Sequence, residues 1–496
     1  MNFADIIKEK SNLKLTENGA MAFEDTGEGS LLDLFSQIGG LRNRQDFEIE
    51  AKFAAAYREN PLLATKMLFY CGDVREGLGE RKIFRICLRW LAVNHPKIME
   101  KNLTSIPFYN RWDSCFELVD TPCEEKMWEF VHSTLQEDLE MVKTAKLRSK
   151  IAVISLLGKW MPSINTSSQK TRLLAKKAMK ALGMKEKTYR QTLSILRRHL
   201  NVVECLMSAR EWDKIDYESV PSYAMNNYYV AFMQHDSEGF TKYLESLKRG
   251  EKKINASVLY PYNLVKTYLG NYFYRTIPED EVIEAQWKAL PNYVQNENNV
   301  IVMADVSGSM CGRPMETSVG LAIYFAQHNR GAYHNKYMTF SSDPRFVCLN
   351  DSMSLAQCVY RTQTDGVGYT TNLGKAFDYI LQNAYENSIP QDEMPKALIV
   401  ISDMEIDEYG DPNYDWSFLD TFKKKFERFG YRLPKIVFWN VEARNDTVLG
   451  RGNNVLYVSG QSISTFKSLC SALDGKTAYE FMLDVLNNAR YSRVEI

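Results

Sequence analysis

Residues 299–310 read N-V-I-V-M-A-D-V-S-G-S-M, a short apolar run that ends in an aspartate and small polar residues. This pattern is typical of a buried strand followed by a polar loop. Downstream, helical patterns such as TSVGLAIYFAQH and LGKAFDYILQNA alternate with the strand patterns KALIVISDME and PKIVFWNV. Strands that alternate with helices indicate a doubly wound α/β sheet, so we expect residues 296–496 to form an α/β domain.

Residues 1–290, by contrast, read as one helix after another. Segments such as ERKIFRICLRWLAVNH, TRLLAKKAMKAL and KTYRQTLSILRRHL carry apolar residues at a spacing of three and four. We expect the helix of TRLLAKKAMKAL to begin at a cap on Ser167 or Ser168 and to end at Gly183. The expected inward stripes of the last two helices comprise Leu173, Leu174, Ala178, Ala181 and Leu182, and then Tyr189, Leu193, Leu196 and Leu200.

Helices joined by short turns over such a length predict a HEAT-like α-solenoid, either open or closed into a ring. No fixed repeat period is visible in the sequence. The expected fold class is therefore multidomain α plus α/β, with an all-helical module over 1–290 and the α/β domain over 296–496.

Composition supports a globular chain. The 496 residues are 45% hydrophobic and 25% charged, with only 26 glycines and 15 prolines. No stretch approaches the roughly 18 apolar residues of a membrane span, and the first residues lack the order of a signal peptide. The nine cysteines are scattered and never form a C-x-x-C pair. We expect a cytoplasmic monomer with buried thiols and no membrane segment.

Charge is distributed unevenly along the chain. The net charge is −1, yet residues 142–214 hold 17 Lys and Arg against four acidic residues. A basic segment in a near-neutral protein favours RNA binding through phosphate contacts, which depend steeply on salt. The alternative is a solvated helix face that pairs with acids elsewhere in the chain. The candidate RNA contacts are Lys170, Arg172, Lys176, Lys177, Lys180, Arg190, Arg197 and Arg198.

Two further arginines, Arg75 and Arg81, bracket two glycines in a segment between helices. They can hold phosphate, or they can cap helix ends and pair with Glu80. The sequence favours neither role.

Three polar clusters occur in the α/β half. Asp305, Ser307 and Ser309 follow the first strand, residues 368–372 precede a helix, and Asp403 ends another buried strand. In doubly wound sheets, ligands bind beyond the carboxyl ends of the strands. Carboxylates and hydroxyls form an all-oxygen set, which a hard cation such as Mg²⁺ prefers. We therefore expect a site for Mg²⁺, or for another divalent cation such as Mn²⁺.

The order D-x-S-x-S, then Thr, then Asp resembles the metal-ion-dependent adhesion site of von Willebrand factor A domains. The resemblance covers about 295–496 and implies that Ser307, Ser309 and Thr371 are direct or near-direct ligands. It also implies that Asp305 and Asp403 bind directly or through water. The alternative is a motif that stabilises its loops without metal.

One departure from the family concerns the second loop. The usual Gly-Gly-Thr is Gly-Tyr-Thr-Thr here, so Thr370 competes with Thr371 for the ligand role. The following residues, Asn372 to Ala376, fit the family's continuation and favour Thr371.

The helical half adds a second resemblance. A helical module followed by this α/β domain is similar to the architecture of Ro ribonucleoproteins, or TROVE proteins, and most similar to a Ro-related, largely uncharacterised family. The segments that carry it are ENGA (17–20), LLDLF (31–35), DVREGLGER (73–81), KWMPS (159–163) and VPSYAM (220–225). The resemblance implies a helical ring joined by the von Willebrand domain. It also implies binding of structured RNA, small non-coding or misfolded, on a basic outer face and of single-stranded RNA ends in the central hole.

The sequence lacks a catalytic motif such as G-x-S-x-G or H-E-x-x-H. We therefore expect a non-enzymatic RNA-binding protein of Ro type. The alternative is a protein-interaction scaffold whose metal site grips an acidic residue of a partner.

Overall fold

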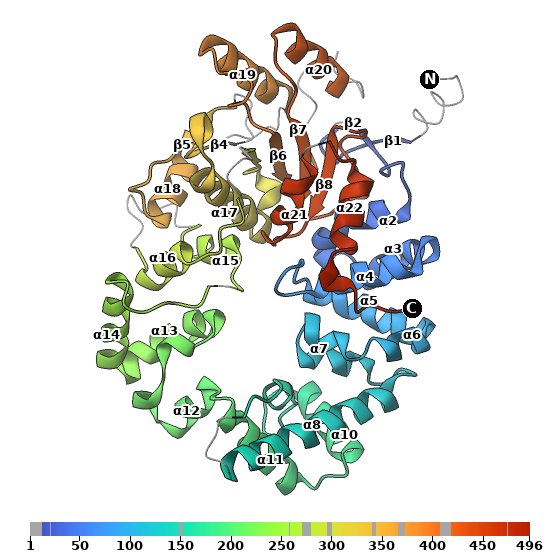
Figure 1. The fold of residues 1–496 in the computed structure, drawn as a ribbon, viewed down its shortest axis with the longest axis vertical. Helices are drawn as coiled ribbons and strands as arrows, with labels where there is room; N and C mark the ends of the chain where they lie inside the picture. Colours follow the sequence, from blue (N-terminus) through green and yellow to red (C-terminus); the bar gives the residue numbers. More distant parts are fainter. Residues whose placement is uncertain are drawn as a thin grey trace. The chain divides into compact units, whose positions relative to one another are not determined.

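The structure, a computed structural model, describes residues 12–19, 21–147, 152–256, 258–269, 279–294, 300–339, 344–365, 373–406, 418–473 and 475–496 (Figure 1). Packing divides the chain into two compact units. The first combines residues 1–71, 75–83 and 256–492, and the second combines 72–74, 84–255 and 493–496. These units are defined by contacts, whereas the ranges 1–290 and 296–496 are defined by a change of sequence pattern.

A six-stranded sheet forms the centre of the first unit, in the order β5-β4-β3-β6-β7-β8. Neighbouring strands are parallel except β4 and β5, which are antiparallel. The strands are β3 (Val300–Ala304), β4 (Lys336–Thr339), β5 (Phe346–Cys348), β6 (Ala397–Ser402), β7 (Lys435–Asn440) and β8 (Val455–Ser459). Every residue of β3, β6, β7 and β8 is buried, which explains why these strands are almost purely apolar.

The strand order reverses between β3 and β6. From β3 the chain proceeds to β4 on one side of the sheet, and it returns to β6 on the other side. In this topology the carboxyl ends of the two central strands border the crevice where ligands bind. The prediction of an α/β sheet in the C-terminal half is confirmed, and Asp305 and Asp403 lie directly after these two strands.

Helices cover the sheet. They are α15 (Pro261–Val265), α16 (Glu281–Lys288), α17 (Arg313–His328), α18 (Leu355–Asp365), α19 (Leu373–Glu386), α20 (Phe418–Arg428), α21 (Thr465–Ala472) and α22 (Ala478–Leu486). Helix α17 packs on β3, β4 and β6, and its Phe325 contacts Trp439 of β7 and Phe466 of α21. Gly320 permits close contact with α15, because a Cβ there would lie 2.9 Å from the Pro261 carbonyl carbon.

The N-terminal segment also packs on this sheet. Its elements are β1 (Leu13–Leu15), β2 (Met21–Phe23), α2 (Ser30–Gln37), the 3-10 helix η1 (Ile38–Asn43), α3 (Asp46–Glu59) and α4 (Pro61–Gly72). Phe23 bridges to Val448, and Gly39 donates its N–H to Ser459 Oγ at 2.9 Å. The first 71 residues are thus part of the same packed unit as the C-terminal sheet.

In the second unit, every regular element among the described residues is helical. These elements are α6 (Pro96–Lys101), α7 (Ser105–Tyr109), η2 (Trp112–Leu118), α8 (Glu124–Leu147), α9 (Leu157–Trp160), α10 (Gln169–Ala181), α11 (Glu186–His199), α12 (Val203–Ala209), η3 (Trp212–Lys214), η4 (Tyr217–Ser219), α13 (Ser222–His235) and α14 (Ser237–Lys248). Helix α5 (Arg81–Asn94) begins in the first unit and continues into the second. The prediction of an N-terminal helical region is confirmed. Among the residues described, no helix is long and apolar enough to cross a membrane.

Helices α10 and α11 lie where the sequence predicts them. Ser168 Oγ caps α10 by accepting the Thr171 N–H at 3.2 Å, and Gly183 ends it at φ +64°. Helix α11 buries Tyr189, Leu193 and Leu196, as expected. The stripe expected for α10 is confirmed at Ala178 and Leu182, which are buried, and wrong at Leu173, which is 54% exposed. Ala175, which the prediction left out, is fully buried beside Ala178, so the helix packs largely through small residues.

Candidate functional site

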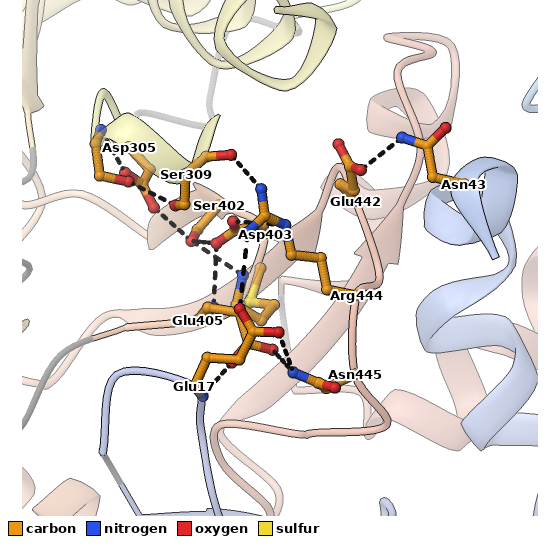
Figure 2. A network of polar contacts seen from close by, with 12 residues as sticks. Glu17, Asn43, Asp305, Ser309, Ser402, Asp403, Glu405, Glu442, Arg444 and Asn445 are labelled. Carbon is orange, nitrogen blue, oxygen red and sulfur yellow. Dashed lines mark hydrogen bonds and ion pairs between the residues drawn. The ribbon is translucent and has the colours of Figure 1, made fainter. Parts of the chain in front are cut away.

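The two predicted aspartates lie side by side at the carboxyl edge of the sheet. Asp305 follows β3 and Asp403 follows β6, and these strands are adjacent and parallel with Ala304 beside Ile401. Ser402 joins them, because its Oγ donates to Asp305 Oδ2 at 2.6 Å and lies 3.5 Å from Asp403 Oδ1 (Figure 2). The topology of the parallel sheet therefore brings together residues that are almost a hundred positions apart.

The two predicted serines occupy the loop after β3. The Ser307 N–H donates to Asp305 Oδ1 at 2.9 Å, and the hydroxyl oxygens of Ser307 and Ser309 are 3.0 Å apart. Four of the five predicted ligands thus form one cluster. Thr371, like its competitor Thr370, lies outside the described residues.

Both carboxylates are almost completely buried, with Asp305 and Asp403 each 1% exposed. Burial raises the pKa of Asp305, and the negative charge of Asp403 raises it further, to about 6. Burial also raises the pKa of Asp403, against the opposing hydrogen bond from the Glu405 N–H. Two buried carboxylates that lie on either side of one serine hydroxyl favour a cation between them.

The donor set fits a hard divalent ion. Asp403 Oδ2 is buried and accepts no hydrogen bond from any described residue. Buried polar oxygens are rarely left without a hydrogen bond, so this atom favours a cation as its partner. The part of the chain that the structure describes contains no group of three or more His, Cys, Asp or Glu side chains placed to hold a metal. A cation here would depend on two carboxylates and on serine and threonine hydroxyls.

Arg444 is a member of the site that the sequence prediction missed. Its Nε lies 3.5 Å from Asp403 Oδ2, and its Nη2 donates to the Ser309 carbonyl oxygen (Figure 2). The residue follows β7, so it reaches the same edge of the sheet as the two aspartates. The signal was present in the sequence, because three polar residues, Glu442, Arg444 and Asn445, closely follow the strand pattern PKIVFWNV.

Glu17 and Glu405 extend the polar network to the N-terminal segment. Glu405 is 3% exposed and accepts the Glu17 N–H at 2.6 Å and the Asn445 Nδ2 at 3.0 Å (Figure 2). Glu17 Oε2 lies 3.7 Å from Arg444 Nη1. The contact of Glu17 with Glu405 spans 388 positions, and its contact with Arg444 is longer still. Nothing in a local sequence pattern reveals them.

The predicted RNA contacts of α10 differ in their surroundings. Lys170, Lys176 and Lys180 are exposed, and no ion pair to them occurs among the residues that the structure describes. Lys177 is exposed and pairs with Asp120 at 2.5 Å. Arg172 donates to the carbonyl oxygens that precede α10, those of Thr166 and Ser167, at 2.6 and 2.8 Å.

On α11, Arg190 and Arg198 are exposed, whereas Arg197 has a structural role. Its guanidinium donates to Gly158 O at 3.0 Å, Met161 O at 2.8 Å and Ser163 Oγ at 2.8 Å. Burial lowers the pKa of this group. Arg197 therefore fixes the loop after α9 instead of facing solvent.

Arg75 and Arg81 are exposed and belong to the first unit, whereas α10 and α11 belong to the second. Glu80, which the sequence offered as a partner for them, forms an ion pair with Arg42 at 2.5 Å.

Comparison with known proteins assigns this chain to a family. Residues 16–110 and 128–300 match a family model described as a domain of unknown function, DUF2828, and residues 299–483 match a second such domain, DUF7788. An uncharacterized protein of Acanthamoeba polyphaga mimivirus is 30% identical over 503 residues, which cover 93% of this chain and 85% of that protein. The crystal structure of the Deinococcus radiodurans RO (RSR) protein is similar at 14% identity over 92% of both chains, with a TM-score of 0.35. The predicted resemblance to a largely uncharacterised family is thus confirmed, and the chain belongs to the DUF2828 family.

Proposed function

We propose that this protein is a non-enzymatic RNA-binding protein of Ro type, with a HEAT-like helical module and a C-terminal domain of the von Willebrand factor A kind. The observation that carries the proposal is the exposed basic surface of α10 and α11. This surface, the basic face, comprises Lys170, Lys176, Lys177, Lys180, Lys185, Lys187, Arg190 and Arg198.

The geometry of the basic face suits a phosphate backbone. Lys176 and Lys180 are one helical turn apart on α10, and Lys187 and Arg190 are similarly placed on α11, so successive charges project from the same side of each helix. Most of these exposed cations form no ion pair with the described residues; the exceptions are Lys177 and Arg190. When such cations contact a polyanion, they release its condensed counterions. Contacts of this kind position RNA without reading its sequence.

The basic residues that the sequence predicts as RNA contacts fall into two groups, exposed residues and residues with a structural role. Arg197 and Arg172 donate hydrogen bonds to nearby backbone oxygens, so they stabilise the helices from which the lysines project. We assign RNA contact to the exposed members only.

In the α/β domain, Asp305, Ser307, Ser309 and Asp403, together with Thr371, would hold Mg²⁺ or Mn²⁺. The convergence of four of these residues and the unsatisfied Asp403 Oδ2 support this assignment. Such an ion supplies an electron-poor centre that accepts one more oxygen from a partner.

The polar cluster also favours a second candidate, a protein-interaction scaffold that grips an acidic partner residue through this ion. The two candidates predict different behaviour on purification. An RNA-binding protein copurifies with nuclease-sensitive material that raises the ratio of absorbance at 260 to that at 280 nm. A ratio typical of bare protein, unchanged by nuclease, together with no affinity for a panel of structured and single-stranded RNAs, would favour the scaffold.

A further inference from the structure

Arg444 lies at the position where a cation would meet Asp403. Among the described residues, it is the side chain that forms an ion pair with Asp403, through Nε at 3.5 Å from Oδ2. That oxygen is the one without a hydrogen bond from any described residue. The same guanidinium donates to the Ser309 carbonyl oxygen, so it is anchored to both loops that carry the predicted ligands.

A divalent ion and a guanidinium cannot both approach this carboxylate closely. Like charges repel strongly at short distance, most of all where burial reduces screening by water, and Asp403 is 1% exposed. Entry of an ion between Asp305 and Asp403 therefore requires Arg444 to move away from Asp403 Oδ2.

An alternative partner for Arg444 is already in place. Glu17 Oε2 lies 3.7 Å from Nη1, on the side of the guanidinium away from Ser309 (Figure 2). The Glu17 backbone is fixed by its N–H bond to Glu405 Oε2 at 2.6 Å. The Arg444 side chain is 34% exposed, so it has room to turn toward this carboxylate.

We propose that Arg444 acts as a tethered cation that pairs with the Asp403 carboxylate when no metal is bound. Arg444 competes with the divalent ion for this carboxylate, and binding of the ion displaces the guanidinium toward Glu17. Arg444 thereby sets the affinity and the occupancy of the metal site. This inference rests on the proposed metal site, and it adds a residue whose role is to weaken that site.

The test measures Mn²⁺ affinity by titration calorimetry for the full chain and three variants. Arg444→Met keeps the length of the side chain but removes its charge, and we expect it to bind Mn²⁺ about fivefold more tightly, the scale of a partly exposed ion pair. Arg444→Lys keeps the charge and should stay within about twofold of the wild type. Glu17→Gln removes the alternative partner and should weaken Mn²⁺ binding by about two- to threefold.

Melting in chelator supplies a second readout and verifies folding. Without metal, Arg444→Met should melt below both the wild type and Arg444→Lys, because the buried carboxylates lose their cation. At saturating Mn²⁺ this deficit should shrink. If Arg444→Met fails to fold, the Glu17→Gln titration carries the same test.

The outcomes are distinguishable. Mn²⁺ affinity that is equal or weaker in a folded Arg444→Met variant, while the wild type binds, overturns the competition and leaves the metal site intact. Absence of Mn²⁺ binding in all four proteins overturns the metal site and the competition together.

Discussion

The carboxyl edge of the sheet and the basic face organise charge in opposite ways. At the edge, Asp305 and Asp403 are each 1% exposed. Ser307 and Ser402 donate hydrogen bonds to Asp305, and the Glu405 N–H donates to Asp403. On α10, Lys176 and Lys180 are exposed without ion pairs to other described residues. A buried site depends on each atom in it, whereas an exposed face acts by the sum of its charges. The first should respond strongly to single substitutions and the second to multiple ones.

The largest effect should come from reversing the charge of the basic face. Changing Lys176, Lys177 and Lys180 together to Glu should weaken RNA binding on the order of a thousandfold, for many RNA sequences alike. The slope of log affinity against log salt should become shallower by about two to three, since each lost phosphate contact removes about 0.7–0.9. Fluorescence anisotropy at several salt concentrations measures both quantities.

A matched reversal of Lys242, Lys248 and Arg249, on and just after α14 of the same unit, controls for net charge. If it reduces affinity as much as the α10 variant does, the effect is one of total charge and the basic face is not the contact. Both variants should melt near the wild-type temperature, since exposed charges contribute little to stability.

At the sheet edge a single substitution should suffice. Saturating Mg²⁺ or Mn²⁺, at a hundred times its dissociation constant, should stabilise the wild type by about 2.7 kcal/mol, or roughly 5 °C in melting temperature. Asp305→Asn should abolish this shift, because the amide keeps the shape but lacks the charge. Differential scanning calorimetry with and without chelator measures it.

Asp378→Asn is the comparison variant, since Asp378 pairs with Lys425 in the same unit and is not one of the predicted ligands. It should retain the full metal shift. A shift that persists in Asp305→Asn would place the ion elsewhere.

Two adjacent arginines on α11 sharpen the comparison within one helix. Arg197→Ala removes three donors to oxygens around residues 158–163 and should lower the free energy of unfolding by about 2–3 kcal/mol. Arg198→Ala, at an exposed position, should change it by less than about 0.5 kcal/mol. Urea denaturation measures both values, and equal losses would contradict the structural role of Arg197.

The smallest effect is expected at Leu173. It is 54% exposed, so Leu173→Ala should alter unfolding by less than about 0.5 kcal/mol. Leu193 is 3% exposed, and Leu193→Ala should cost about 2–5 kcal/mol. The same urea experiment compares them, and similar costs would restore the inward stripe that the sequence predicts for α10.

The sequence predicted the elements well because their signals are local. The apolar run before Asp305, the one before Asp403 and the three-and-four spacing around Leu193 each predict an element from adjacent residues. The meeting of Asp305 with Asp403 followed from one general rule about the carboxyl ends of strands in doubly wound sheets.

What the sequence analysis missed depends on contacts between distant segments. Arg444 and Glu17 approach one another from distant parts of the chain. Glu17 belongs to the family segment ENGA (17–20), but nothing in that segment points to a contact with Arg444. Leu173 was misplaced because α10 packs through Ala175 and Ala178, and periodicity alone gives small apolar residues less weight than leucine.

The bridge between Phe23 and Val448 has a consequence for synthesis on the ribosome. At about 5–20 residues per second, some 20–80 seconds separate the emergence of these two residues. During that interval, apolar side chains of α2 such as Leu32 and Phe35, which are buried in the finished unit, lack the two C-terminal elements that pack on this helix, β8 and α22. A nascent chain in this state exposes apolar surface, and chaperones that bind such surface have tens of seconds in which to do so.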